Sequence, residues 1–304
     1  MSVFHSGERL VQELLGVEEF ANSVGTMIKP TISDRFEAFL NEQNMLMIGS
    51  MDKNGQVWSS FIAGDPGIIQ VIAPNKIRIN TKINEFDPLF SNIEENKEIG
   101  VVVINLVSRI RMRINGVISK NSNGSIEVQA EQVYGNCPKF IQARNFSYKP
   151  DINKQNKVAY REKNLTQSQQ VWINQSDTFF IASSSSEGKM DVSHRGGMPG
   201  FIKVFENGSL MFPDYSGNNL FNTLGNIVQN PKVGLLFINF ENGDILQLSG
   251  EAHVIWEMND DMLSQFPGAE RLVEFQVKEV IQTDTAGYYQ WEFIKYSPFN
   301  PKAI

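Results

Sequence analysis

The chain contains two copies of one sequence pattern, and this duplication restricts the folds that it can adopt. The segment MLMIGSMDKNGQVWSSFIAGDPGIIQVI, which starts at residue 45, aligns with TFFIASSSSEGKMDVSHRGGMPGFIKVF, which starts at residue 178, at a constant offset of 133. Small and turn-forming residues coincide: Gly55 with Gly188, Ser60 with Ser193, Gly64 with Gly197, and Pro66-Gly67 with Pro199-Gly200. A duplicated supersecondary unit must build the same local structure twice.

The correspondence continues through the rest of each copy with small gaps. The matched segments are residues 77–79 with 210–212, Leu89-Phe90 with Leu220-Phe221, IGVVVINL from Ile99 with VGLLFINF from Val233, and RMRINGVI from Arg111 with ILQLSGEA from Ile245. Five matches in the same order are not expected by chance. Both copies should therefore share one topology.

Each copy has the pattern of many short strands and one helix. Runs of β-branched and aromatic residues with period-two alternation, bounded by turn residues, predict the strands. Apolar residues at helical spacing predict a helix over about 219–229 in copy two, which ends before Asn230-Pro231. We therefore expect a mainly β protein with some helix (α+β), in which each copy forms a small antiparallel barrel.

Five segments are expected along the chain: an N-terminal helical extension (1–42), copy one (43–147), a polar linker (148–170), copy two (171–285) and an aromatic tail (286–304). The extension should hold two helices between residues 5 and 42, and in the first of them Leu10, Val11, Leu14 and Leu15 form one apolar face. The linker should lead into a helix before Trp172. The tail, rich in aromatic residues, should pack on a surface.

Composition excludes several functional classes. The formal net charge of -7 argues against binding to nucleic acid or to anionic membranes, which needs clustered Lys and Arg. The single cysteine, Cys137, cannot form an intramolecular disulfide. No signal-peptide pattern is present, and no apolar run approaches the roughly 18 residues of a transmembrane helix, so we expect a cytoplasmic protein.

The second copy carries polar residues that favour an anionic ligand with a ring. In DVSHRGG, Asp191, Ser193 and Arg195 alternate and should share one strand face, where a guanidinium could bind a phosphate or a carbonyl. A surface ion pair between Asp191 and Arg195 would explain the same pattern. His194 should point to the opposite strand face, away from this pocket.

Two further segments of copy two add candidate contacts. Tyr215, Ser216, Asn218 and Asn219 precede the predicted helix, where backbone N–H groups and the helix dipole attract anions, although simple N-capping uses the same residue types. In LQLSGEAHVI, Gln247 should face the pocket or a solvated hairpin surface.

These motifs together resemble the pyridoxamine 5'-phosphate oxidase-like FMN-binding split barrels, in the duplicated subgroup that also occurs fused to flavohaemoprotein or ferredoxin-reductase modules. The segments that carry the resemblance are DVSHRG, PGF, PDYSGN, NPKVGLLF, LSGEA, FHSGE at Phe4, QVYGNCPKFIQAR at Gln132, and the terminal SPFNP. The resemblance implies two tandem split β-barrels that form an internal pseudo-dimer, with FMN bound at the barrel interface.

The resemblance also assigns roles to positions of this chain. It makes Arg195 a flavin or phosphate contact, while Ser216, Asn218 and Asn219 occupy the segment where the oxidase has an Arg-Lys pair. Lys203, in the next strand, could supply the missing charge. Copy one has Trp58 and Ile62 at the positions of Asp191 and Arg195, so it should carry no ligand site of its own.

Trp58 could then be a stacking surface in the wall of the pocket, or part of the core. Cys137 could be a nucleophile or a small buried hydrophobe, with Lys139 and Arg144 near it in an anion site. The three histidines, His5, His194 and His253, show no paired spacing, so no metal site is expected.

Three functions fit these residues. The first is an FMN-dependent oxidoreductase acting on an unknown small-molecule substrate with an unknown electron donor. The second is a flavin-binding protein or sensor without catalysis, and the third is a split barrel that binds another ligand such as haem or a deazaflavin. The oligomeric state cannot be derived from the residues, and a homodimer remains an option.

Overall fold

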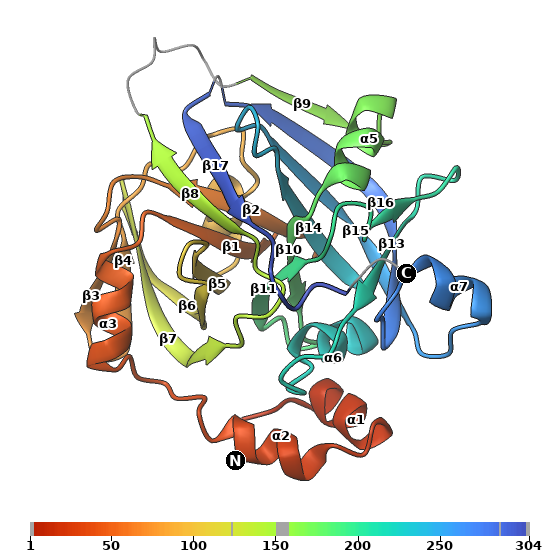
Figure 1. Ribbon diagram of the computed structural model, residues 1–304. Coiled ribbons are helices and arrows are strands. Elements are labelled where there is room, and N and C mark those ends of the chain that lie inside the picture. The colour runs from red at the N-terminus through yellow and green to blue at the C-terminus, as the bar shows by residue number, and fades with distance from the viewer. Residues whose placement is uncertain (1–2, 123, 150–157, 286, 302–304) are drawn as a thin grey trace.

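The computed structural model describes residues 3–122, 124–149, 158–285 and 287–301, and it contains two seven-stranded antiparallel arrangements with one topology (Figure 1). The first sheet has the order β2-β1-β5-β6-β7-β4-β3. Its strands are β1 (Met45–Met51), β2 (Val57–Ala63), β3 (Ile69–Ala73), β4 (Lys76–Ile79), β5 (Glu98–Asn105), β6 (Ile110–Ser122) and β7 (Ser125–Asn136).

The second sheet repeats that order as β11-β10-β14-β15-β16-β13-β12. Its strands are β10 (Thr178–Ser184), β11 (Met190–Gly196), β12 (Lys203–Val204), β13 (Leu210–Asp214), β14 (Lys232–Ile238), β15 (Ile245–Ile255) and β16 (Arg271–Asp284). Each strand of copy one has its counterpart at the same place in copy two. The predicted duplication and the predicted split-barrel fold class are confirmed.

The helices α4 (Leu89–Glu95) and α6 (Asn222–Gln229) also correspond, but not at the predicted register. Asn92 donates to Ser50 Oγ at 3.0 Å, and Asn226 makes the same bond to Ser183 Oγ at 2.9 Å. These asparagines differ by 134 positions, so the predicted pairing of Leu89 with Leu220 was wrong by three residues.

The predicted helix start at residue 219 was also too early. Asn219 and Phe221 have left-handed backbones, with φ of 58° and 59°, which cannot continue a right-handed helix. The helix therefore begins at Asn222.

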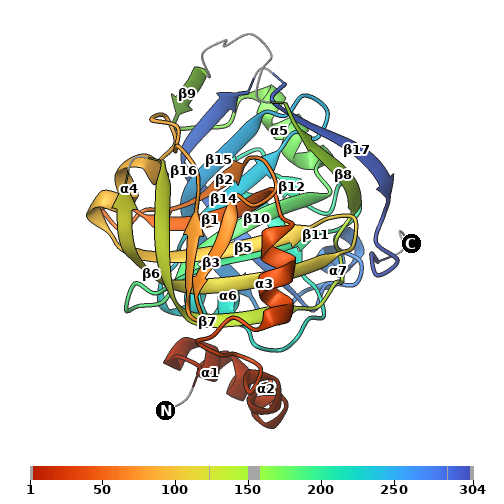
Figure 2. The ribbon, with the colours of Figure 1, turned by 90° about the vertical axis from the view of Figure 1, so that its left-hand side faces the viewer.

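The N-terminal extension contains three helices rather than the two that were predicted: α1 (Ser6–Leu14), α2 (Glu18–Gly25) and α3 (Asp34–Asn41). A left-handed Gly16, with φ of 64°, separates α1 from α2. Figure 2 shows α3 lying across the first sheet, with α1 and α2 below it. The predicted apolar face of α1 is divided, because Val11 is buried whereas Leu10 and Leu14 are exposed.

Helix α1 crosses α6 at very close range. A Cβ added to Gly7 would lie 2.2 Å from the carbonyl oxygen of Gly225, so only glycine fits there. Gln12 donates to the backbone oxygen of Leu220 at 3.1 Å. The extension is thereby fixed to the helix that borders the candidate site.

The predicted linker and tail both contain strands. In the linker, strand β9 (Val158–Glu162) pairs with β16, and residues 150–157 lie outside the described part. The helix that follows, α5 (Gln167–Gln175), begins before Trp172 and contains it. In the tail, β17 (Tyr289–Lys295) pairs with β8 (Ala143–Tyr148). Within copy two, α7 (Asp260–Gln265) precedes β16. Tyr289 is buried as predicted, but Phe293 and Phe299 are exposed; residues 286 and 302–304 are not described.

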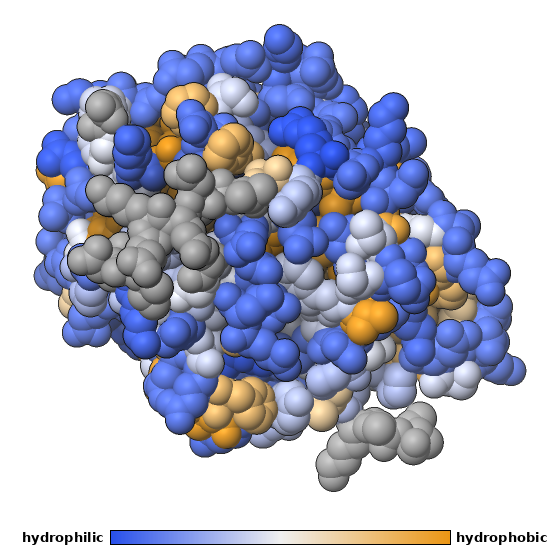
Figure 3. Space-filling view, turned by 90° about the horizontal axis from the view of Figure 1, so that it is seen from above, coloured by the Kyte–Doolittle hydropathy of each residue, from blue (hydrophilic) through white to orange (hydrophobic). Residues whose placement is uncertain are grey.

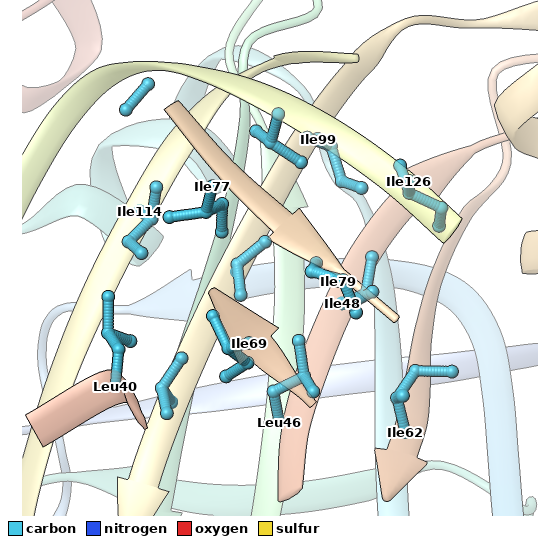
Figure 4. Packing of buried hydrophobic residues seen from close by; sticks show 14 of the residues in the cluster. Leu40, Leu46, Ile48, Ile62, Ile69, Ile77, Ile79, Ile99, Ile114 and Ile126 are labelled. Carbon is cyan, nitrogen blue, oxygen red and sulfur yellow. The ribbon is translucent and has the colours of Figure 1, made fainter. Parts of the chain in front are cut away.

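Each copy has its own hydrophobic core, and a third core joins the copies. Figure 4 shows the core of copy one, built from isoleucines and leucines of β1 to β7 and α3. The joining core includes Met47 and Val102 of copy one with Phe180 and Leu236 of copy two. Gly49 and Gly234 let the sheets approach, since a Cβ at Gly234 would lie 2.7 Å from the Cα of Trp58. The copies thus form an internal pseudo-dimer.

The outer surface seen in Figure 3 is mostly hydrophilic, with small separate hydrophobic patches. Within the described ranges no helix is both long and apolar enough to cross a membrane.

Candidate functional site

One cavity lies between the two copies and takes its walls from both. It encloses about 820 Å³ of empty space, its open mouth included. Copy two contributes the end of β11, the loop from Tyr215 to Phe221 and the first turn of α6, and copy one contributes the start of β6 and the segment from Asn136 to Phe140. The cavity is therefore built by the pseudo-dimer and not by either barrel alone.

Arginines of both copies line this cavity, namely Arg111, Arg113 and Arg195. Arg111 donates to the backbone oxygen of His194 at 3.2 Å, and its Nη1 lies 2.9 Å from Nδ1 of the same residue. Among the described residues it has no carboxylate partner, and its Nε has no hydrogen-bond partner. Burial, and then Arg113 and Arg195, lower the pKa of Arg111 to about 9, so it remains a cation at neutral pH.

Arg113 is the centre of a buried polar network. It donates to Asp191 at 3.2 Å, to Asn222 Oδ1 at 3.0 Å and to Ser193 Oγ. Burial lowers the pKa of Arg113, but Asp191 and Tyr134 outweigh that effect and the pKa is raised. Asp191 thus supports the floor of the cavity from behind, and it does not line the cavity itself.

Arg195 is held by a different carboxylate. Its Nη1 donates to Asp214 at 2.7 Å, and Arg271 donates to the other oxygen of Asp214 at 2.9 Å. The alternative ion pair between Asp191 and Arg195 is therefore wrong, because each residue pairs elsewhere. The Nε of Arg195 has no partner.

The loop before α6 leaves the helix N-terminus open to the cavity. No side chain caps α6; Asn218 instead accepts a hydrogen bond from the N–H of Leu220 at 3.2 Å, inside the loop. The N-capping alternative for this segment is wrong. Uncapped N–H groups and the helix dipole make this end of α6 favourable for an anion.

Aromatic side chains form the outer wall of the cavity. The rings of Phe140, from copy one, and Tyr215, from copy two, lie 4.9 Å apart at 31°. Phe140 has a left-handed backbone with φ of 65°. Phe201 and Phe221 line the same cavity. An aromatic wall beside a cationic floor suits a flat ring that carries a phosphate.

The structure brings together most of the residues predicted for the site. Those that line the cavity are Ser193, Arg195, Tyr215, Ser216, Asn218 and Asn219. Besides Asp191, three others do not line it. Lys203 faces the ring of Phe266 at 5.7 Å, and Gln247 donates to the backbone oxygen of Ser59 at 2.9 Å. Trp58 is buried, and its Cα lies beside Gly234 of copy two. Trp58 is therefore buried where the two sheets meet, and it does not form a wall of the cavity.

The prediction missed the arginines of copy one. The signal was present in RMRINGVI, whose alternation places Arg111 and Arg113 on one strand face, while copy two has Ile245 and Gln247 there. His194 was expected to point away, but it lies against Arg111 and borders the cavity. Burial, followed by Arg111 and Arg195, holds the pKa of His194 well below its usual value, so the ring is neutral.

Cys137 and Lys139 also line the cavity, whereas Arg144 pairs with Asp177 at 2.6 Å. No group of three or more His, Cys, Asp or Glu in the described ranges could hold a metal ion.

A family model described as pyridoxamine 5'-phosphate oxidase matches residues 32–154 and 165–284, which together make up most of the chain. The chain belongs to the pyridoxamine 5'-phosphate oxidase-like family. Each of the two matched ranges contains one copy of this split barrel, so family membership and duplication agree. A comparison with curated proteins found no match.

Several solved structures resemble part of this family member. HupZ of Group A Streptococcus is 14% identical, with 40% of this chain and 97% of HupZ covered at a TM-score of 0.33. A putative pyridoxamine 5'-phosphate oxidase of Lactobacillus delbrueckii is 20% identical; the match covers 38% of this chain and 93% of that protein at a TM-score of 0.32. An FMN-binding protein of Syntrophomonas wolfei is 8% identical; the match covers 37% of this chain and 82% of that protein at a TM-score of 0.30.

Proposed function

We propose that the cavity between the copies binds FMN and that the protein is an FMN-dependent oxidoreductase. The observation that carries this proposal is the cationic cluster beside the uncapped start of α6, in which Arg111 has no carboxylate partner among the described residues. A partly buried cation without a counter-ion is costly unless a ligand supplies the negative charge. The phosphate of FMN is such a ligand.

The residues present fit FMN as a cofactor. Arg111, Arg195 and the first N–H groups of α6 would hold the phosphate, while Arg113 is fixed below them by Asp191. Asn218 and Asn219 lack the charge of the Arg-Lys pair that the oxidase has in this segment, and Arg111 of copy one would supply positive charge in its place. Phe140 and Tyr215 would cover the ring and exclude water.

When bound, FMN supplies hydride or electron transfer, so the protein needs no dedicated acid or base for that step. The neutral ring of His194 adds no positive charge beside Arg111.

The test begins with the absorption spectrum and mass identification of any copurifying ligand. A flavin spectrum with the mass of FMN supports the proposal. If the copurifying ligand is haem or a deazaflavin, the cavity binds that ligand and not FMN. Bound FMN without turnover of reduced nicotinamides or pyridoxamine phosphate would favour the sensor function. Protein that is colourless and does not take up added FMN contradicts the proposal.

A variant locates the ligand. Arg195→Ala should weaken FMN binding, measured by flavin fluorescence quenching, while Asp214 keeps Arg271 as a partner and the fold is retained. The matched control is Arg161→Ala, whose exposed ion pair with Glu279 lies outside the cavity. Unchanged FMN affinity in Arg195→Ala would remove this residue from the site.

A further inference from the structure

Strained backbone conformations gather at the cavity between the copies. In the described part of the chain, four residues other than glycine have a left-handed backbone, with φ between 55° and 65°. They are Arg109, Phe140, Asn219 and Phe221, and the last three line the cavity. A Cβ disfavours this conformation, so each residue keeps it only where its surroundings hold it there. The contacts that hold Phe140 therefore bear on the cavity.

Phe140 is held at both of its backbone polar groups. Its N–H donates to Ser297 Oγ at 3.1 Å, and its carbonyl oxygen accepts from Gln142 Nε2 at 3.0 Å. The same oxygen lies so close to Gly196 that a Cβ there would be 2.1 Å away, which leaves room only for glycine. The backbone of Phe140 is thus fixed by contacts to the tail and to the end of β11.

The amide of Gln142 connects this segment to the tail. The side chain is fully buried, and its Oε1 accepts from the N–H of Ser297 at 2.8 Å and from Asn300 Nδ2 at 3.0 Å. Its Nε2 also donates to the backbone oxygen of Gly197 at 3.0 Å. An amide with these partners keeps its orientation, since turning it over would place donor against donor and acceptor against acceptor.

Arg109 provides a second link between the same two segments. Its Nε donates to the backbone oxygen of Ile141 at 2.9 Å, and its Nη2 donates to the backbone oxygen of Tyr296 at 3.1 Å. Ile141 directly follows Phe140 in the chain, and Tyr296 directly precedes Ser297. The tail and the segment around Phe140 are therefore held together at two separate places.

The ring of Phe140 is the part of this arrangement that a ligand meets. It packs against Tyr215 of copy two at 4.9 Å and 31°, so the outer wall joins both copies. A change of the Phe140 backbone away from its left-handed conformation would turn the Cα–Cβ bond and move the ring from Tyr215. Ser297 and Asn300 do not line the cavity, so they can act on a ligand only through other residues.

We infer that Ser297, Asn300 and Gln142 are positioning residues of the cavity. They hold Phe140 in its left-handed conformation and keep its ring in the outer wall, which limits how fast molecules enter and leave. The consequence for FMN rests on the proposed function, whereas the control of access by Phe140 does not. The SPFNP motif of the tail thereby contributes to the ligand site from outside it.

Cys137 reports on access to the cavity, because it is the single cysteine of the chain and lines the cavity close to Phe140. The experiment measures the rate at which iodoacetamide alkylates Cys137 in the full chain as purified, by mass spectrometry. Ser297→Ala removes the acceptor of the Phe140 N–H, and we expect alkylation to become roughly three- to tenfold faster, as for one lost hydrogen bond. An unchanged rate overturns the inference.

The matched control is Ser185→Ala. Like Ser297, Ser185 is buried and accepts backbone N–H groups through its Oγ, namely those of Glu187 and Lys189, but it does not line the cavity. This variant should lose a similar amount of stability in urea denaturation and leave the alkylation rate unchanged. Equal acceleration in both serine variants would mean that Cys137 reports general loosening of the fold, which overturns the inference.

A double-mutant cycle determines whether the tail acts through the ring. Phe140→Ala should itself accelerate alkylation of Cys137, and adding Ser297→Ala to it should change the rate by less than roughly twofold. If Ser297→Ala keeps its full effect without the ring, the tail acts by another route and the inference is wrong. Asn300→Ala removes a partner of Gln142 and should also accelerate alkylation, so it replaces Ser297→Ala if that variant does not fold.

Release of FMN is measured separately. In protein that contains FMN, Ser297→Ala should release it roughly three- to tenfold faster, followed by the recovery of flavin fluorescence after dilution, and Ser185→Ala should release it at the rate of the parent. Faster alkylation with unchanged FMN release would show that Phe140 does not limit the cofactor. Protein that takes up no FMN contradicts the proposed function, and the alkylation rates then decide the positioning role alone.

Discussion

Arg113 of copy one donates to both carboxylate oxygens of Asp191 in copy two, at 3.2 Å each. The two side chains are only 9% and 4% exposed, so this ion pair joins the two barrels inside the protein. Breaking a buried pair by removing one partner leaves an uncompensated charge, which is far more costly than losing a surface ion pair.

The first prediction concerns this pair. Asp191→Asn should lower the free energy of unfolding by about 3 to 5 kcal/mol, because Arg113 loses its counter-ion while Ser193 and Asn222 remain as neutral acceptors. Urea denaturation measures the change. Glu279→Gln removes the partner of the exposed Arg161 and should lower the free energy of unfolding by less than about 1 kcal/mol. If both variants lower the free energy of unfolding by the same amount, the buried ion pair contributes no more to stability than the one between Arg161 and Glu279.

The second prediction separates stability from ligand binding. Arg111→Met removes a cation that has no carboxylate partner in the described structure, so the ligand-free protein should be as stable as the parent or more stable. Its FMN affinity should fall by about 1.5 to 3 kcal/mol, roughly ten- to a hundredfold, because a charged hydrogen bond to the phosphate is lost. Thermal melts without ligand and fluorescence titrations with FMN give the two quantities. A variant that loses stability but not affinity would assign Arg111 a structural role.

The third prediction concerns pH. Burial is the main cause that raises the pKa of Glu8 to about 7 from its ordinary value of 4.5, although the N–H of His5 and the amide of Asn222 donate to it. A carboxyl whose folded pKa is raised binds its proton more tightly in the folded state. Stability should therefore fall as the pH rises from about 4.5 to about 7, by about 3 kcal/mol for this group.

Glu8→Gln should remove that part of the pH dependence, since the amide cannot ionise. The measurement is the free energy of unfolding at several pH values between 5 and 8. Glu13→Gln, an exposed position on the same helix, should keep the slope of the parent. Parallel slopes for the parent and Glu8→Gln would contradict the assignment.

The fourth prediction tests the contact between the sheets. In Gly234→Val, the new Cβ would lie 2.7 Å from the Cα of Trp58 and 2.7 Å from the carbonyl oxygen of Val57, both backbone atoms. We expect the free energy of unfolding to fall by about 1 to 3 kcal/mol or more, since the backbone of β2 must move. Gly217→Ala, whose nearest neighbour would be 3.9 Å away, is the control and should unfold like the parent. Calorimetry distinguishes the two.

The fifth prediction is stoichiometric. Because both walls of the cationic cavity come from one chain, a saturated monomer should contain one FMN per chain and need no second copy. Flavin absorbance per protein, combined with the mass in solution from light scattering, measures this ratio. Two FMN molecules per chain would mean that the pseudo-symmetric position, where Ile62 and Ile245 replace Arg195 and Arg111, also accepts the cofactor.

The sequence was sufficient for the features that depend on local pattern. Period-two alternation and paired glycine turns predicted two equal barrels, because each strand's spacing is determined by its own residues. The start of α6 was not predictable in that way, since the left-handed Asn219 and Phe221 are set by the loop that they close. Similarly, Asp191 pairs with Arg113 because β11 of copy two packs near β6 of copy one. The local D-x-S-x-R pattern contains no information about that packing.

The arginines that copy one contributes to the cavity could be predicted from the sequence only in part. Arg111 and Arg113 were visible as an alternating pair, and the gapped alignment matched them to Ile245 and Gln247. Their significance appears only when β6 of one barrel is seen to reach the ligand side of the other. A comparison of the copies position by position, applied to charge rather than to hydrophobicity, would have indicated them.

The fusion of both barrels into one chain has a genetic consequence. In a dimer of identical subunits, every mutation appears at both junctions, so a change that improves one ligand site is also imposed on the other. Here Arg111 and Ile245 are encoded separately, although they occupy equivalent places. Each junction can therefore accumulate substitutions on its own, and an engineer can redesign one pocket while leaving its counterpart untouched.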